Sequence, residues 1–428
     1  MFKDNIYKQI PDNVISICEI LEQNGESGWV VGGSIRDLIM DKDPKDFDLA
    51  TSATPQKVIS LFKRVIPTGL KHGTVTVLIK NDAYEITTFR QDGDYLDSRH
   101  PENVQFVTDI NDDLSRRDFT INAIAYNPVK NIFADPFDGV TDIKNRIIKA
   151  VGNAEARFNE DALRILRCAR FSASLGFEVE ADTIKGILTT NEGLKNISVE
   201  RIREEFIKLL LSDSPALGLD ILFKTGSLKY ISPPVNNLFT GKDGESYYKI
   251  TVKRVEKSPK NITAKMVAAL IDTDNYIEWI ENFTLDNKTK KEIIHLLTLL
   301  PLKISTSMSN YDLRILASKI TKSAIEIFLE IAKADEIAKT GSDKNVSFLE
   351  AEFKKLKIYD TPLSVKELNI NGDQIITALK IKPGVHMKII LNTLLDEVMN
   401  NPQLNKTDEL IKLSEKIYME ATSSRVIK

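Results

Sequence analysis

The sequence has few of the residues that stabilise secreted or zinc-binding proteins. Its 428 residues include two cysteines, Cys18 and Cys168, and four histidines. Neither cysteine belongs to a CxxC pair, so we expect no disulfide framework and no zinc site. Cysteine usage of this kind is typical of a reducing, cytoplasmic compartment.

Long apolar runs and a strong excess of one charge are also missing. No stretch of about 18 apolar residues occurs, so we expect no membrane span. The polar start, MFKDNIYKQIPDNV, differs from a secretory signal. The formal net charge is -3. The chain as a whole therefore lacks the excess of basic residues that many nucleic-acid-binding proteins have, and only local basic patches could bind phosphate. The length predicts about two to four domains.

The first 150 residues alternate between helix and strand patterns. The expected elements are a helix over Pro11–Asn24, a strand at Trp29–Val31, a helix over Ile35–Met40, a strand with Phe47–Leu49, a helix from Pro55 to about Val65 capped by Thr54, and a hairpin of Thr74–Ile79 and Tyr84–Phe89 turning at Asn81–Asp82. From about Val151 onward helical periodicity dominates. We therefore predict a small α+β head followed by an all-helical remainder.

Two carboxylates form a D-x-D pair at Asp46 and Asp48. On a strand such residues point to the same side, and they repel each other unless a cation lies between them. Mg²⁺ prefers one or two carboxylates together with substrate phosphates. Glu85 on the following hairpin is the candidate third ligand. A D-x-D alone is more often a solvated turn, and Glu85 fits an ordinary exposed strand position equally well.

A small-residue turn precedes this pair. Gly32, Gly33 and Ser34 lie between the first strand and its helix, where backbone N–H groups can approach a phosphate. Arg36 adds a positive charge inside that helix. A phosphate cradle followed by a metal pair is what nucleotidyl transfer requires, in which a 3′-hydroxyl attacks an α-phosphate and expels pyrophosphate.

Several segments, in this order, resemble the motifs of the class II tRNA nucleotidyltransferase and bacterial poly(A) polymerase family. They are VGGSIRDL at 31–38 with DFDLAT at 46–51, TGLKHGTV at 68–75, EITTFR at 85–90, RRDFTINA at 116–123 and EDALRILR at 160–167. The resemblance implies a mixed-sheet, polymerase β-like head with a helical neck, body and tail. It also implies addition of CCA to tRNA from CTP and ATP, with Mg²⁺ as cofactor.

The family pattern implies a role for each matching residue. Asp46, Asp48 and Glu85 would bind the metals; Gly33 and Arg36 would contact phosphates or sugar; Arg117 would contact the triphosphate or ribose; Asp118 would organise its turn; and Asp161, Arg164, Arg167 and Arg170 would lie on the base-reading helix. The sequence departs from the pattern at Asp41, where the family usually has glycine, and at 382–388, where a PGxxIG tail motif lacks its second glycine.

The expected helix Glu160–Phe171 has an apolar side and an arginine side. Asp161 and Arg164 would be neighbours at i, i+3. Cytosine and adenine both present an amino donor beside a ring-nitrogen acceptor, which an aspartate and an arginine complement, whereas uracil and guanine mismatch. The alternative is a solvated basic face.

Two further segments bear on specificity. The polar stretch Gln91–Phe106 is long for a loop, and in the resemblance it is the loop that helps the site switch from CTP to ATP. Its presence favours full CCA addition or addition of A alone. The alternative is an ordinary insertion. The basic segment Thr251–Lys260 is a weak candidate for RNA contact.

We expect a catalytic head at 1–148, a neck for base recognition at 149–215, a body at 216–355 and a tRNA-binding tail at 356–428. The oligomeric state stays open. Four alternatives stay open as well: an A-adding enzyme of the same family, a poly(A) polymerase, a nucleotidyltransferase with a small acceptor, and a non-catalytic RNA-binding protein. The intact carboxylates and the long helical remainder argue against the last two.

Overall fold

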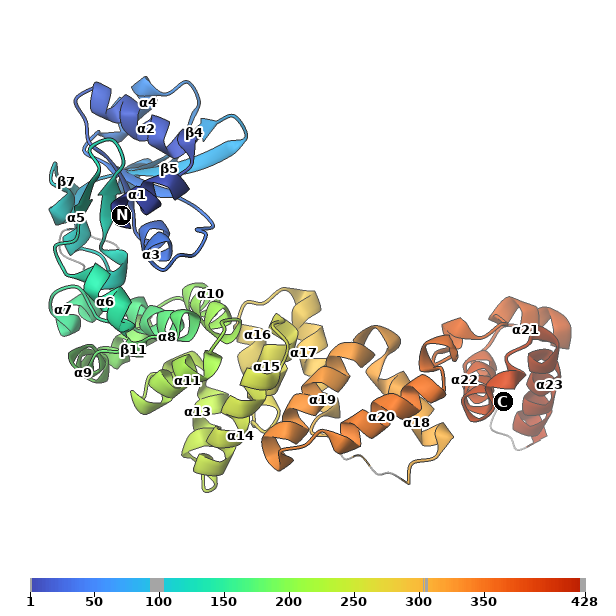
Figure 1. Ribbon diagram of the computed structural model, residues 1–428. Helices are drawn as coiled ribbons and strands as arrows, with labels where there is room; N and C mark the ends of the chain where they lie inside the picture. Colours follow the sequence, from blue (N-terminus) through green and yellow to red (C-terminus); the bar gives the residue numbers. More distant parts are fainter. Residues whose placement is uncertain (1, 93–103, 303, 305–306, 424–428) are drawn as a thin grey trace. The chain divides into compact units, whose positions relative to one another are not determined.

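The computed structural model describes residues 2–92, 104–302, 304 and 307–423, which form two compact units (Figure 1). The first contains Met1–Asn237 and Glu278–Thr284, and the second contains Leu238–Ile277 and Leu285–Lys428. The predicted divisions at 149, 216 and 356 stay predictions.

A seven-stranded sheet forms the head of the first unit, in the order β3-β4-β5-β2-β1-β8-β9. Its strands are β1 Gly28–Val31, β2 Asp48–Thr51, β3 Val65–Gly69, β4 Thr74–Ile79, β5 Asp82–Thr88, β8 Ala125–Asn127 and β9 Ile132–Ala134. β2 and β5 are parallel and the other neighbours are antiparallel. The sheet is therefore mixed, which confirms the predicted class of the head.

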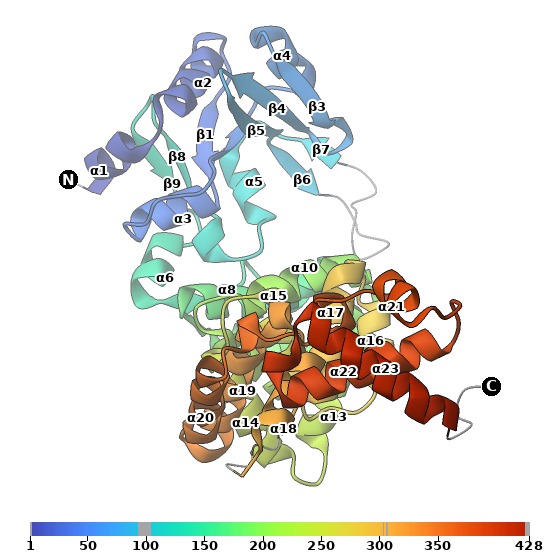
Figure 2. The same ribbon diagram turned by 90° about the vertical axis from the view of Figure 1, so that its right-hand side faces the viewer.

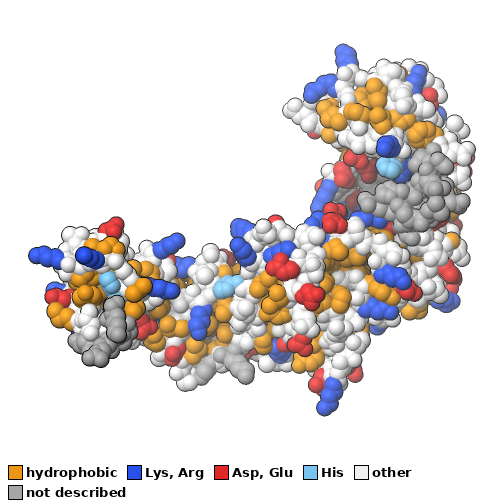
Figure 3. All heavy atoms as spheres, turned by 180° about the vertical axis from the view of Figure 1, so that it is seen from behind, with side chains coloured by type: hydrophobic (Ala, Val, Ile, Leu, Met, Phe, Trp, Pro, Cys, Tyr) orange, Lys and Arg blue, Asp and Glu red, His pale blue; other side chains and the backbone are white. Residues whose placement is uncertain are grey.

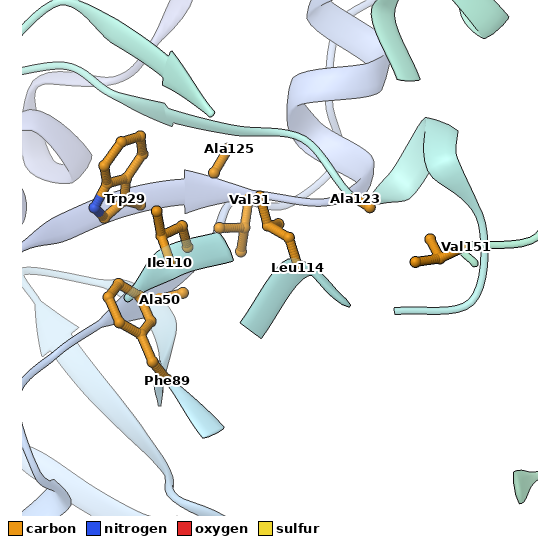
Figure 4. Close-up of a cluster of buried hydrophobic side chains, with 9 residues drawn as sticks. All are labelled: Trp29, Val31, Ala50, Phe89, Ile110, Leu114, Ala123, Ala125 and Val151. Carbon is orange, nitrogen blue, oxygen red and sulfur yellow. The ribbon is translucent and has the colours of Figure 1, made fainter. Parts of the chain in front are cut away.

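The helices of the head are α1 Phe2–Gln9, α2 Asp12–Gln23, α3 Gly33–Ile39, α4 Pro55–Leu61, α5 Ile110–Ser115 and α6 Gly139–Asn145. α2 packs against β1 so closely that a Cβ on Gly28 would lie 2.9 Å from the Cα of Cys18. On the other face, α5 supplies Ile110 and Leu114 to a cluster with Trp29, Val31 and Phe89 (Figure 4). This cluster anchors the strands that carry the acidic residues.

The predicted helix from Pro55 to Val65 is too long. α4 has Thr54 as its N-cap, as expected, with the side chain accepting a hydrogen bond from the Lys57 N–H at 3.3 Å. However, the helix ends at Leu61. Val65 instead begins β3, because it pairs with Val77 of the neighbouring hairpin. Tertiary pairing therefore overrides the local helical pattern.

Helices form most of the remaining first unit: α7 Ala154–Glu160, α8 Leu163–Leu175, α9 Ala181–Thr190, α10 Val199–Leu210, α11 Pro215–Lys224 and α12 Leu228–Ile231. Figure 2 shows α8 and α10 below the sheet of the head. The predicted neck is not entirely helical, because the two-residue strand β11 Glu178–Val179 pairs in parallel with β10 Ile147–Ile148. A separate antiparallel pair joins β6 Arg90–Asp92 to β7 Val104–Phe106.

The described part of the second unit contains helices and no strand. Its longer helices are α14 Gly244–Lys257, α15 Ile262–Leu270, α17 Asn287–Leu299, α18 Asn310–Ile320, α19 Ile325–Thr340, α20 Lys344–Lys355, α22 His386–Asn400 and α23 Thr407–Ser423. α13 Pro233–Thr240 and α16 Tyr276–Asn282 span the division between the units. Side chains of both charges are interspersed on the visible face of these helices (Figure 3).

One residue of the predicted basic segment lies in the core of the second unit. The Arg254 side chain has no exposed surface, and its Nη1 lies 2.6 Å from both Asp272 Oδ2 and Asp335 Oδ1. Its Nε donates to the carbonyl oxygen of Ala268 at 2.7 Å. Arg254 is thus a buried structural residue, while Lys253, Lys257 and Lys260 remain exposed.

Candidate functional site

Three carboxylates meet at one end of the head sheet. β2 begins at Asp48, and Asp46 precedes the strand instead of belonging to it. Leu49 pairs with Ile86 in the parallel ladder, which sets Asp48 beside Glu85 on β5. Asp46, Asp48 and Glu85 line one pocket of about 1040 Å³. The structure therefore brings the predicted acidic residues together, although they do not share a strand.

The electrostatics of this pocket favour a cation. Partial desolvation raises the pKa of Asp48, and the nearby carboxylates of Asp46 and Glu85 raise it further. Among the described residues, none forms a hydrogen bond or ion pair with these three side chains. Oxygen ligands with uncompensated negative charge suit a hard divalent cation. In the described part of the chain, however, no three such groups are already gathered closely enough to hold a metal.

In the turn after β1, the backbone at Gly32 lies close to a neighbouring side chain. It has φ 71° and is the N-cap of α3, and a Cβ there would lie 2.9 Å from Nη1 of Arg117. Gly33 begins the helix. Arg36 is fixed by its neighbours: Nη1 donates to Asn122 Oδ1 at 2.7 Å and Nε donates to Asp37 Oδ1 at 2.9 Å. The cradle and its arginine thus lie against the RRDFTINA segment.

A second pocket in the same unit, of about 340 Å³, is rich in arginine. Its lining residues are Arg116, Arg117, Asp118, Asn122, Asp161, Leu163, Arg164, Arg167 and Arg201. Of the predicted nucleotide-binding residues, it gathers Arg117, Asp161, Arg164 and Arg167. Gly33, Arg36 and Arg170 do not line it.

Arg117 has spare hydrogen-bonding capacity in this pocket. Its Nη2 lies 3.3 Å from Asp113 Oδ2 and its Nη1 donates to the Asn122 carbonyl at 3.4 Å. Its Nε is buried and has no partner among the described groups. Burial lowers the pKa of the guanidinium, and Asp113 partly opposes this effect. A buried, unpaired donor gains from an anionic ligand.

Asp118 organises its turn, as expected. Its Oδ1 accepts hydrogen bonds from the Phe119 N–H at 2.9 Å and from Asn122 Nδ2 at 3.1 Å. Its Oδ2 accepts from Arg167 Nε at 2.8 Å. Burial alone would raise the pKa of Asp118, but Arg167 and these hydrogen bonds hold it at about 2.

The predicted continuous helix Glu160–Phe171 is wrong. α7 ends at Glu160 and α8 begins at Leu163, with Asp161 in an extended conformation between them. The break is stable because Asp161 Oδ1 accepts a hydrogen bond from the Leu163 N–H at 3.0 Å. Asp161 and Arg164 still line the same pocket, but they approach it from a turn and a helix, respectively.

The arginine side of α8 is not a solvated face. Arg164 is 9% exposed; its Nη1 lies 2.5 Å from Glu160 Oε2, and its Nη2 donates to the Arg116 carbonyl at 3.1 Å. Arg170 pairs with the buried Glu205. Buried arginines carry a desolvation cost unless they are paired, which explains why each has an acceptor.

Two residues that the motifs did not single out support the site. Arg201 Nη2 lies 2.7 Å from Asp161 Oδ2, and its Nη1 is buried without a partner among the described groups. Asp113 holds Arg116 at 2.8 Å and Arg117 at 3.3 Å. The i, i+3 and i, i+4 spacing could have indicated Asp113. No local signal links Arg201 to a residue 40 positions away.

Comparison with known proteins covers nearly the whole chain. A CCA-adding enzyme of Ligilactobacillus salivarius strain UCC118 is 36% identical over 421 residues, which are 97% of this chain and 99% of the relative. The chain belongs to the CCA-adding enzyme family. A CCA-adding enzyme of Oceanobacillus iheyensis is 34% identical over 403 residues, covering 92% of this chain and 94% of the relative.

Family models and a solved structure agree with this membership. Residues 28–149 match the poly A polymerase head domain, 176–239 match a probable RNA- and SrmB-binding site of polymerase A, and 254–413 match tRNA nucleotidyltransferase domain 2. The crystal structure of the Bacillus stearothermophilus CCA-adding enzyme in complex with CTP is 30% identical to this chain. It superposes with a TM-score of 0.76 and covers 96% of this chain and 97% of the other.

Two expectations concern features outside this site. Most of the predicted loop Gln91–Phe106 lies outside the described residues, namely at 93–103. No helix within the described ranges is long and apolar enough to cross a membrane.

Proposed function

We propose that this chain adds the 3′-terminal CCA to tRNA from CTP and ATP without a nucleic-acid template. One observation carries the proposal: the acidic pocket and the arginine pocket adjoin. Val31 pairs with Asp48 across β1 and β2, and a Cβ on the next residue, Gly32, would lie 2.9 Å from Nη1 of Arg117, which lines the arginine pocket. A triphosphate that spans both pockets would meet cations along its phosphates and carboxylates at its α-phosphate.

Asp46, Asp48 and Glu85 would hold the divalent metal ions that the family uses, and we propose Mg²⁺ as the ion. When bound, such ions lower the pKa of the attacking 3′-hydroxyl and stabilise the leaving pyrophosphate. The raised pKa of Asp48 and the lack of protein partners for the three carboxylates support this role. Gly33 and Arg36 would face the phosphates or sugar.

The arginine pocket would bind the nucleotide. The unpaired Nε of Arg117 would donate to a phosphate or ribose oxygen. Asp161 would accept the amino group shared by cytosine and adenine, and Arg164 would donate to their ring nitrogen. Arg167 and Arg170 would contribute to nucleotide binding from the same helix, α8. Uracil and guanine would leave buried polar groups unpaired, which penalises them.

The remaining parts would serve the RNA. We propose residues 1–148 as the catalytic head, 149–215 as the base-recognising neck, 216–355 as the body and 356–428 as a tRNA-binding tail. The match of residues 254–413 to tRNA nucleotidyltransferase domain 2 supports a tRNA-directed arm. A tRNA substrate in turn fits a cytoplasmic location.

The test is nucleotide addition to three tRNA transcripts that end at the discriminator base, at C and at CC. Each receives Mg²⁺ with CTP, ATP or both. We expect two C and one A on the first transcript, and no addition by the Asp46→Ala, Asp48→Ala double variant. Asp43→Ala is the matched control, because Asp43 is an exposed acid outside both pockets.

The other outcomes identify the alternatives. Growth on the CC end alone would indicate an A-adding enzyme, and long A tails on any RNA would indicate a poly(A) polymerase. Full activity in the double variant would overturn the assignment of the carboxylates.

A further inference from the structure

The ring of Phe171 is surrounded by positive charge. The guanidinium Cζ atoms of Arg170, Arg167 and Arg36 lie 3.9, 5.3 and 5.4 Å from the ring centroid. All three are within the range of a cation–π interaction, which structures show roughly once per 70–80 residues. The Phe171 ring is only 7% exposed. Hydrophobic packing of such a ring does not require three cation–π interactions.

The three arginines come from different parts of the first unit. Arg36 belongs to α3, which begins at the glycine turn of the head, whereas Arg167 and Arg170 belong to α8 of the predicted neck. A fourth contact comes from Phe119, whose ring meets Phe171 edge-on at a centroid distance of 5.8 Å. Phe171 is therefore the point at which the phosphate cradle, the RRDF segment and the arginine helix meet.

Each guanidinium is also paired with an acceptor of its own. Arg36 binds Asp37 and Asn122, Arg167 binds Asp118, and Arg170 binds Glu205. Arg167 Nη1 also lies 3.7 Å from Glu205 Oε1, so acceptors hold both Arg36 and Arg167 at more than one nitrogen. Like charges this close repel one another, and burial strengthens the repulsion. The negative face of an aromatic ring offsets that repulsion.

The Phe171 ring offsets the repulsion among the arginines without accepting a hydrogen bond from their N–H groups. A carboxylate at this position would engage the guanidinium N–H groups, whereas a ring attracts the cation through its π face. Because each terminal guanidinium nitrogen carries two N–H groups, donors beyond these bonds stay available for a phosphate or a base. An aliphatic side chain of similar volume would fill the space but would remove the attraction of the ring face for the three cations.

We propose that Phe171 is a positioning residue for nucleotide binding, which fixes Arg36, Arg167 and Arg170 relative to one another across the head and the neck. This inference rests on the proposed function of the same site. Phe171 acts through the arginines and does not itself contact the nucleotide.

The test compares Phe171→Leu with Phe158→Leu in the full-length chain. Phe158 in α7 is also buried, at 0% exposed, and makes no cation or ring contact with any of the described residues, so its substitution reproduces the loss of packing. We expect Phe171→Leu to weaken CTP binding, measured by calorimetry with Mg²⁺, by about 3- to 30-fold. KM for CTP and ATP should rise with it, and kcat should change less. Phe158→Leu should leave both constants within about 2-fold.

A series of fluorinated phenylalanines at position 171 removes the question of folding. Stepwise fluorination keeps the ring close to its original size and weakens the negative face, so CTP affinity should fall with each fluorine. The same analogues at position 158 should show no trend. Equal CTP affinities for the two leucine variants, or a flat fluorine series at 171, would overturn the inference. A wild-type chain that neither binds CTP nor extends tRNA would instead overturn the proposed function.

Discussion

Arg167 and Asp118 join two segments that lie 49 residues apart. The Nε and Nη2 atoms of Arg167 lie 2.8 and 2.7 Å from Oδ2 of Asp118. Arg167 is on α8, and Asp118 begins the turn that leads into the short helix Thr120–Asn122. The pair therefore fixes the arginine helix against the turn that presents Arg117 to the pocket.

The Asp118 carboxylate should make stability depend on pH. Its pKa of about 2 lies below the ordinary value near 4, so its contribution is present above about pH 4 and is lost as the pH falls toward 2. Asp118→Asn should lower the free energy of unfolding at pH 7 by about 2 kcal/mol. Urea titrations at pH 7, 4 and 3 should show the difference from wild type shrinking with pH. A difference that stays constant would contradict the pairing with Arg167.

Asp113 should matter more for stability than its neighbour on the same helix. Its carboxylate is buried and pairs with Arg116 and Arg117, and the two arginines keep its pKa low against the opposing effect of burial. Asp113→Ala leaves both cations without their acceptor and should cost about 3–5 kcal/mol. The matched variant Asp112→Ala, at an exposed position of α5, should cost within about 0.5 kcal/mol. Thermal unfolding of both variants measures the contrast, and equal costs would refute it.

Local signals predicted much of the head. Thr54 caps its helix, the hairpin turns after Ile79, and Asp41 has φ 57° where the family usually has glycine. Each of these depends on backbone preferences within a few residues, and aspartate tolerates the left-handed region. Asp46, Asp48 and Glu85 were predicted to lie together, and they line one pocket; metal binding by them stays a prediction.

Non-local contacts decided what the sequence could not predict. Val65 joins a strand because Val77 is available to pair with it. At the helix break, the Asp161 carboxylate accepts the local Leu163 N–H and is also held by Arg201 from another helix. The arginines of α8 have the same periodicity as a solvated face, but Arg167 and Arg170 are only partly exposed and pair with Asp118 and Glu205. The periodicity of a sequence predicts which residues share one side of a helix. It does not predict which other segments of the chain pack against that side.

Within the basic segment Thr251–Lys260, Arg254 should stabilise the fold, whereas its exposed neighbours should not. It is fully buried and bridges Asp272 and Asp335, whereas Lys253 beside it is exposed. Arg254→Ala should destabilise the second unit by about 3–5 kcal/mol, since Asp272 and Asp335 lose their buried partner and keep only Lys339, at 3.5 and 3.0 Å. Lys253→Ala should change stability by less than about 0.5 kcal/mol. Urea unfolding followed by circular dichroism measures both. Equal stability of the two variants would contradict the buried network.

The carboxylates of the acidic pocket should lower the stability of the folded chain while serving nucleotide addition. Asp48 keeps some exposure to solvent, yet partial desolvation and the charges of Asp46 and Glu85 raise its pKa. Its ionised form therefore destabilises the folded chain, and this penalty is present above the folded-state pKa and absent below the unfolded one. Asp48→Asn should raise the melting temperature at neutral pH by on the order of 1–2 °C. It should also reduce nucleotide addition at least about 10²-fold.

Mg²⁺ should raise the melting temperature of the wild type and leave that of the variant nearly unchanged. Asp43→Asn, which alters an exposed acid outside the pocket, should behave like the wild type in all three measurements. A lower melting temperature for Asp48→Asn, or an equal response to Mg²⁺, would mean that repulsion among these carboxylates does not govern the pocket.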